Sequence, residues 1–109
     1  MNLRISDGQL RFRITRDELS ELLQGGALQL ALPFLAGMQE CRIVTGNLQH
    51  RLALREEKNV LTLTVDRAAL EAFEKQLPSR EGMEHTVMLA GGVPLILMLE
   101  VDVRKSKAK

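Results

Sequence analysis

The side chains with the clearest chemical potential are arginines at alternating positions. Arg11 and Arg13 have this spacing, and Arg4 precedes them on the other side of an Asp7-Gly8 pair. Because residues two apart along a strand point to the same face, these arginines would share one surface. Guanidinium groups bind carboxylates and phosphates through paired hydrogen bonds. The spacing therefore predicts a sheet face that binds anionic groups.

Residues 2–14 are expected to form a β-hairpin that positions these arginines. The Asp7-Gly8 pair is typical of a type I′ turn, in which both central residues have positive φ angles. In that register Arg4 lies directly opposite Arg11, and the apolar side chains share the other face. Like charges directly opposite each other on a sheet repel, so another group is expected to offset this pair.

A second hairpin is expected over residues 40–53, with its turn at Gly46-Asn47. Its register would place Arg42 opposite Arg51 and so repeat the arrangement of the first hairpin. Together the two hairpins define a predicted binding surface of five arginines, namely Arg4, Arg11, Arg13, Arg42 and Arg51.

Three interpretations remain open. In the first, the carboxylates of Glu40, Glu100 and Asp102 neutralise the arginines within the fold. In the second, the arginines bind an acidic protein partner, a second copy of the chain or a small anion. In the third, which does not involve the arginines, the protein is a structural subunit whose strand at residues 28–34 pairs with another chain.

An enzymatic alternative uses the same arginines to bind a phosphate or triphosphate. Glu100 and Asp102 would then hold a Mg²⁺ ion beside it. This arrangement is similar to that of the triphosphate tunnel enzymes, whose barrels line a cavity with basic and acidic side chains. Those enzymes carry an N-terminal Glu-x-Glu-x-Lys motif, whereas the corresponding strand here is Leu3-Arg4-Ile5. The leading hypothesis is therefore a non-catalytic binding module, with no catalytic residue, resident metal ion or cofactor.

Other chemically versatile side chains give weaker signals. His50 and His85 lack metal-ligand spacing to each other or to Cys41. Cys41 falls on an apolar strand face, which predicts an inert buried thiol. His50 falls on the same face and is expected to be a hydrogen-bonded core histidine. The sequence contains no P-loop, nucleophile elbow or dinucleotide-binding fingerprint.

Composition narrows the class of partner. The chain has 109 residues and a net charge of +1, with no Trp or Tyr and three Phe. Nucleic-acid binders show a larger basic excess, and single-strand binders need aromatic stacking platforms, so a nucleic-acid partner is not expected. No membrane span or signal peptide is expected either. The lone cysteine fits a reducing compartment, which predicts a cytoplasmic location.

The expected elements follow the order ββ-α-β-βββ-α-ββ. Thr15 and Glu18 form a capping-box signal for the first helix, and Asp66 caps a second helix at about residues 67–77. The remaining hairpins turn between Glu56 and Asn59 and at Gly91-Gly92. Pro33 places its strand at a sheet edge.

These elements predict an α+β fold with a mostly antiparallel sheet of about seven or eight strands, open or barrel-like, and two helices. Residues 1–103 are expected to form a single domain, and residues 104–109 a basic, disordered tail. The sequence shows no internal repeat.

The start of the chain also resembles a family of small uncharacterised bacterial proteins, a domain of unknown function. The similar residues are Arg4-Ile5, Gly8, Arg11-x-Arg13-Ile14-Thr15 and Glu18. They form an Arg-rich amphipathic hairpin that leads into a Thr-x-x-Glu-capped helix. The resemblance implies a bacterial origin and supplies no catalytic residues, because the family has no assigned activity.

Overall fold

Charged and apolar residues alternate at the start of the chain, and the predicted hairpin forms there. In the computed structural model, strands β1 (Asn2–Ser6) and β2 (Gln9–Ile14) pair antiparallel with Arg4 opposite Arg11, as expected. The turn is not type I′, because Gly8 has a positive φ of 74° and Asp7 does not. Glycine adopts this φ without steric cost, whereas a residue with a Cβ resists it.

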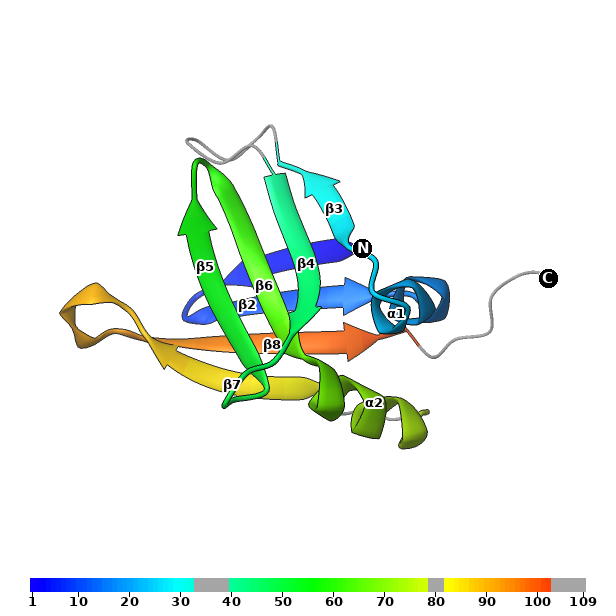
Figure 1. The fold of residues 1–109 in the computed structure, drawn as a ribbon. Helices are drawn as coiled ribbons and strands as arrows, with labels where there is room; N and C mark the ends of the chain where they lie inside the picture. Colours follow the sequence, from blue (N-terminus) through cyan, green and yellow to red (C-terminus); the bar gives the residue numbers. More distant parts are fainter. Residues whose placement is uncertain (33–39, 79–81, 103–109) are drawn as a thin grey trace.

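The structure describes residues 1–32, 40–78 and 82–102. Within them the chain forms eight strands, two α-helices and a short 3₁₀ turn (Figure 1). The remaining elements are α1 (Arg16–Leu23), β3 (Leu28–Ala31), β4 (Glu40–Gly46), β5 (Leu52–Glu57), β6 (Val60–Asp66), α2 (Arg67–Lys75), β7 (Met83–Met88), η1 (Ala90–Gly92) and β8 (Pro94–Val101). The α+β class and the predicted element order are confirmed. The predicted tail at 104–109 lies outside the described residues.

The strands form two sheets and not one. The first sheet has the order β1-β2-β8-β7, and the second has the order β3-β4-β6-β5. Four of the six strand pairings are antiparallel, but the central pairs β2–β8 and β4–β6 are parallel. Figure 1 shows the strands of the second sheet crossing those of the first, with both helices at one end.

The predicted hairpin at 40–53 is wrong. Strand β4 pairs with β3 and β6, and β6 lies between β4 and β5 in the sheet. Arg42 therefore does not lie opposite Arg51. The segment after Gly46 is not a tight turn: its residues form bends that carry the chain to the far side of β6. The type I′ geometry occurs instead at Lys58-Asn59, where both φ values are positive (51° and 67°).

An aliphatic core fills the space between the sheets. Alternate residues of β2 and β8 face those of β4 and β6, so each strand contributes every second side chain. The largest fully buried side chains include Phe12, Ile14, Ile43, Leu63, Leu97 and Leu99. The opposite faces of both sheets carry the polar and charged side chains.

Both helices begin at side-chain caps. The Thr15 hydroxyl accepts a hydrogen bond from the Glu18 N–H (3.1 Å), and the Glu18 carboxylate accepts one from the Thr15 N–H (2.9 Å), which confirms the predicted capping box. The Asp66 carboxylate accepts hydrogen bonds from the N–H groups of Ala69 (3.0 Å) and Leu48 (2.9 Å). Such caps each contribute about 1 kcal/mol to stability.

The fold consists of two copies of one ββαββ unit. The first runs from β1 to β4 and the second from β5 to β8. In each unit the first two strands belong to one sheet and the last two belong to the other. When β1 to β4 are matched in turn with β5 to β8, the order of the first sheet, β1-β2-β8-β7, becomes β5-β6-β4-β3, which is the order of the second sheet. The helix caps Thr15 and Asp66 occupy equivalent positions, 51 residues apart. The repeat that the sequence did not show is therefore present in the topology.

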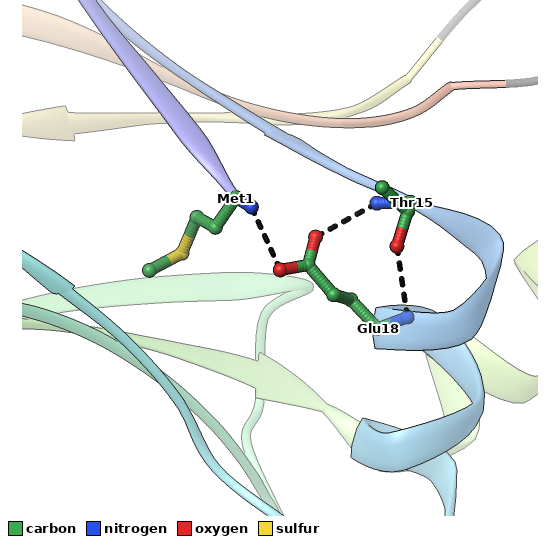
Figure 2. A network of polar contacts seen from close by, with 3 residues as sticks. All are labelled: Met1, Thr15 and Glu18. Carbon is green, nitrogen blue, oxygen red and sulfur yellow. Dashed lines mark hydrogen bonds and ion pairs between the residues drawn. The ribbon is translucent and has the colours of Figure 1, made fainter.

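The first helix cap also binds the start of the chain. The Met1 amino group donates to the Glu18 carboxylate at 2.7 Å (Figure 2). Burial acts to raise the pKa of Glu18, but the hydrogen bonds from the Met1 amino group and from Thr15 outweigh it and hold the pKa below its ordinary value. The ionised carboxylate is therefore the form that the fold stabilises.

This shift makes the contribution of Glu18 dependent on pH. Because the folded-state pKa lies below the unfolded value of about 4.3, the stabilisation is complete above that pH and is lost as the pH falls through the folded-state pKa. We expect Glu18→Gln to be less stable than the original chain near neutral pH and the difference to shrink in acid. Urea unfolding across this pH range measures it, with Asp17→Asn as the control. A difference that stays constant with pH would contradict the prediction.

Candidate functional site

Three of the five predicted arginines share the outer face of the first sheet. Arg4 on β1 and Arg11 and Arg13 on β2 point away from the core, as the alternation requires. We call this group the arginine face. In the register, Arg11 lies beside Met98 of β8, and Arg13 lies beside Glu100.

Arg11 is the most enclosed of the three, with 37% of its side chain exposed. Its Nε atom lies 3.5 Å from Glu100 Oε2, and its Nη2 atom donates weakly to Gln9 Oε1 at the same distance. The Nε atom is buried but makes no hydrogen bond, because the contact with Glu100 is an ion pair without hydrogen-bond geometry. The chain therefore holds this guanidinium in place without satisfying all of its donors.

Internal neutralisation of the arginine face is incomplete. Glu100 was one of the carboxylates expected to offset the opposed arginines, and it does contact Arg11. In the described part of the chain, neither Arg4 nor Arg13 forms an ion pair. The basic charge therefore gathers on the β1–β2 side of the face, and the acidic charge of Glu100 and Glu84 lies on the β8–β7 side.

The other two predicted arginines lie elsewhere. Arg42 lies on the outer face of the second sheet, where its Nη2 atom is 3.1 Å from Glu40 Oε2. Arg51 lies just before β5, beside a cavity next to α2. The expectation of a single five-arginine surface is therefore wrong, because it depended on a β4–β5 pairing that does not form.

The proposed metal ligands of the enzymatic alternative do not form a larger cluster. Glu100 points into the arginine face, and the backbone N–H of Asp102 donates to the Ile14 carbonyl at 2.8 Å. Across residues 1–32, 40–78 and 82–102, no three His, Cys, Asp or Glu side chains are placed to hold a metal ion together.

The side chains of the two histidines are in contact, which their spacing in the sequence did not predict. The rings of His50 and His85 stack at a centroid distance of 4.7 Å and an interplanar angle of 20°. His50 is exposed and not a core residue, because it lies in the bends before β5 and not in a strand. The stack connects the segment before β5 to β7, and β5 itself also contacts β7.

One end of the first sheet extends beyond the second. Figure 1 shows the β7–β8 hairpin projecting past β5 on the left. Large apolar side chains are exposed near this end, and Met88 at the hairpin is 65% exposed. Ile5, on the edge strand β1, is 55% exposed although it points toward the core side of the sheet. Sequence alternation predicted the face of Ile5 correctly but could not show where the covering sheet ends.

The predicted inert thiol is buried as expected. Cys41 on β4 is fully buried, and burial together with the negative charge of Glu40 raises its pKa to about 11. A thiol with this pKa remains protonated near neutral pH and is a poor nucleophile.

The comparisons with known proteins identify a family and no activity. Residues 1–106 match the model described as "Family of unknown function (DUF7009)". No curated protein and no solved structure matches the chain significantly. Among the described residues, neither helix has the length and apolar character needed to cross a membrane.

The buried thiol gives a direct test of the packing around β4. At about pH 8 we expect iodoacetamide to alkylate Cys41 at least about 100-fold more slowly in the folded protein than in urea, because little thiolate exists at a pKa this high. Mass spectrometry of timed samples measures both rates. Equal rates would show that the thiol is accessible and contradict the described packing.

Proposed function

The chain belongs to DUF7009, a family of unknown function, and we propose that it is a non-catalytic binding module whose arginine face binds an acidic segment of a protein partner. The observation that carries this proposal is the excess of guanidinium groups on β1 and β2. Three arginines share this face, and one carboxylate, that of Glu100, contacts one of them.

The edge position of β1 favours a partner segment in extended conformation. Strand β1 is at the edge of the first sheet, so no strand of the described residues pairs with the backbone groups on its outer side. Exposed edges of this kind pair with an added strand through main-chain hydrogen bonds. A segment added beside β1 would place alternate side chains next to Arg4 on one face and next to Ile5 on the other. Acidic and apolar residues in alternation match both neighbours.

The same geometry argues against two of the other occupants. If β1 paired with β1 of a second copy, the Arg4 side chains of both copies would gather on one face, and β1 contains no carboxylate to offset them. A small anion needs converging donors in a concavity, whereas these arginines lie along a sheet surface. An acidic strand supplies several carboxylates at the spacing of the sheet.

The enzymatic alternative has less support. It requires Glu100 to hold a metal ion, but this carboxylate lies against Arg11, and a guanidinium beside a carboxylate competes with a bound cation. We therefore propose a binding role in the bacterial cytoplasm, where a buried free thiol such as Cys41 stays reduced.

A peptide-binding experiment tests the proposal. The probe is a fluorescein-labelled peptide in which Glu alternates with Val, compared with the same peptide carrying Gln in place of Glu. We expect the Glu peptide to bind more tightly and its affinity to fall with added salt. The double variant with Arg4→Glu and Arg13→Glu should weaken binding by at least about tenfold, as expected when like charges replace opposite ones across an interface.

Arg55→Glu is the matched control, because Arg55 is the counterpart of Arg4 in the second ββαββ unit and lies exposed on the other sheet. It should leave the affinity unchanged. Circular dichroism verifies that each variant is folded. Equal binding of the Glu and Gln peptides, or full affinity in the Arg4/Arg13 variant, would overturn the proposed surface. A thermal shift that requires triphosphate with Mg²⁺ and disappears in Glu100→Gln would favour the enzymatic alternative instead.

A further inference from the structure

A cavity opens between helix α2 and the start of β7, away from the arginine face. Its volume is about 320 Å³, and its lining comes from three segments, through Arg51, Ala69, Ala72, Phe73, Gln76, Gly82 and Met83. Four of these residues lie along one side of α2, at the spacing of successive helical turns. The volume is at the small end of the range for small-molecule sites.

Among the described residues of this lining, Arg51 is the only one with a cationic side chain. In the described part of the chain it forms no ion pair. Two contacts fix the segment that carries it: the Arg51 carbonyl accepts a hydrogen bond from the Asp66 N–H at 2.9 Å, and the neighbouring His50 stacks on His85 of β7. These contacts fix the backbone of Arg51 beside the cavity, and its exposed guanidinium has no carboxylate partner among the described residues.

The first ββαββ unit shows what occupies the equivalent place there. With Thr15 and Asp66 as equivalent caps, Glu18 corresponds to Ala69, and Glu21 corresponds to Ala72. The Glu18 carboxylate binds the Met1 amino group. The side chain of Glu21 packs against Gly26, where an added Cβ would lie 2.8 Å from Glu21 Cγ. The first unit therefore has a glutamate paired with a cation at the position of Ala69 and an exposed glutamate at the position of Ala72.

In the second unit both glutamates are replaced by alanine, and the cation beside them is Arg51. We propose that this cavity is a binding site for a small carboxylic acid, whose carboxylate binds Arg51 in place of the missing glutamate. The planar guanidinium accommodates a carboxylate through two parallel hydrogen bonds. Phe73 and Met83, which are largely buried, provide apolar contact for a short carbon chain, and Gln76 provides an amide at the rim.

Close packing at Gly82 fixes the side of the cavity that is formed by the start of β7. A Cβ at this position would lie 2.4 Å from the Leu99 carbonyl oxygen of β8, so the chain passes here at a distance that only glycine permits. This contact holds the start of β7 directly against β8 and keeps Met83 under the cavity. The cavity is thus bounded by packed backbone on one side and by the alanine face of α2 on the other.

The proposal predicts binding that can be followed by NMR titration of the full chain. The probes are acetate, succinate, glutarate and citrate, with inorganic phosphate as the alternative anion. We expect at least one carboxylate to shift the amide signals of α2 and the start of β7 in a saturable manner. Arg51→Gln should weaken its affinity by at least about tenfold, as loss of a charged hydrogen-bonding partner does. Arg55→Gln, which changes an exposed arginine on the same sheet, should leave it unchanged.

A second pair of variants separates charge from volume. Ala69→Glu restores the glutamate that binds the cation in the first unit, so it should abolish acid binding and raise the midpoint of thermal unfolding by placing a carboxylate near Arg51. Ala69→Gln introduces a side chain of nearly the same volume, so it should also block binding but without that gain. The absence of saturable shifts with every carboxylate, or retained affinity in Arg51→Gln, would overturn the site. Saturation by phosphate alone would overturn the carboxylate assignment.

These outcomes are independent of the arginine face, because Arg51 and the cavity take no part in the proposed peptide surface. The Arg4/Arg13 variant should bind the acid normally, and Arg51→Gln should bind the acidic peptide normally.

Discussion

The parallel pairing at the centre of each sheet is the constraint on which the rest of the structure depends. Strands β2 and β8 come from opposite ends of the chain, and β4 and β6 from opposite sides of its middle. Each pair joins one strand of the first ββαββ unit to one strand of the second, so neither sheet exists within a single unit. Each helix connects a strand of one sheet to a strand of the other, and both helices lie at the same end of the structure. The caps at Thr15 and Asp66 then determine where each helix begins.

Local features were predictable from the sequence because their causes are local. The first hairpin, its register, the Thr15–Glu18 capping box and the Asp66 cap each depend on residues a few positions apart. The division into two sheets depends on long-range pairing, and alternation does not specify a neighbour. The predicted 40–53 hairpin failed for this reason: Gly46-Asn47 is a good turn signal, but β6 takes the place beside β4.

The candidate site was predictable to the same extent. Arg4, Arg11 and Arg13 were placed correctly on one face because a single hairpin carries all three. Arg42 and Arg51 were misplaced because their position required a long-range pairing. The cavity could not be predicted, because its lining comes from α2, β7 and the segment before β5. Its one sequence signal, the alanines of the second helix where the first has glutamates, is visible only once the two units are aligned through their caps.

Comparison of the two units separates what the fold requires from what it does not. Core positions stay apolar in both, as Leu10, Phe12 and Ile14 correspond to Leu61, Leu63 and Val65. The surface positions differ in charge: Arg11 and Arg13 correspond to Thr62 and Thr64, although both sets lie on outer sheet faces. Since the second unit forms the same sheet pairing with threonines, the arginines are not needed to build the strand. Glu100 offsets the charge of Arg11, whereas Arg4 directly opposite has no ion-pair partner in the described part of the chain, so the repulsion between the two guanidiniums is only partly relieved within the fold.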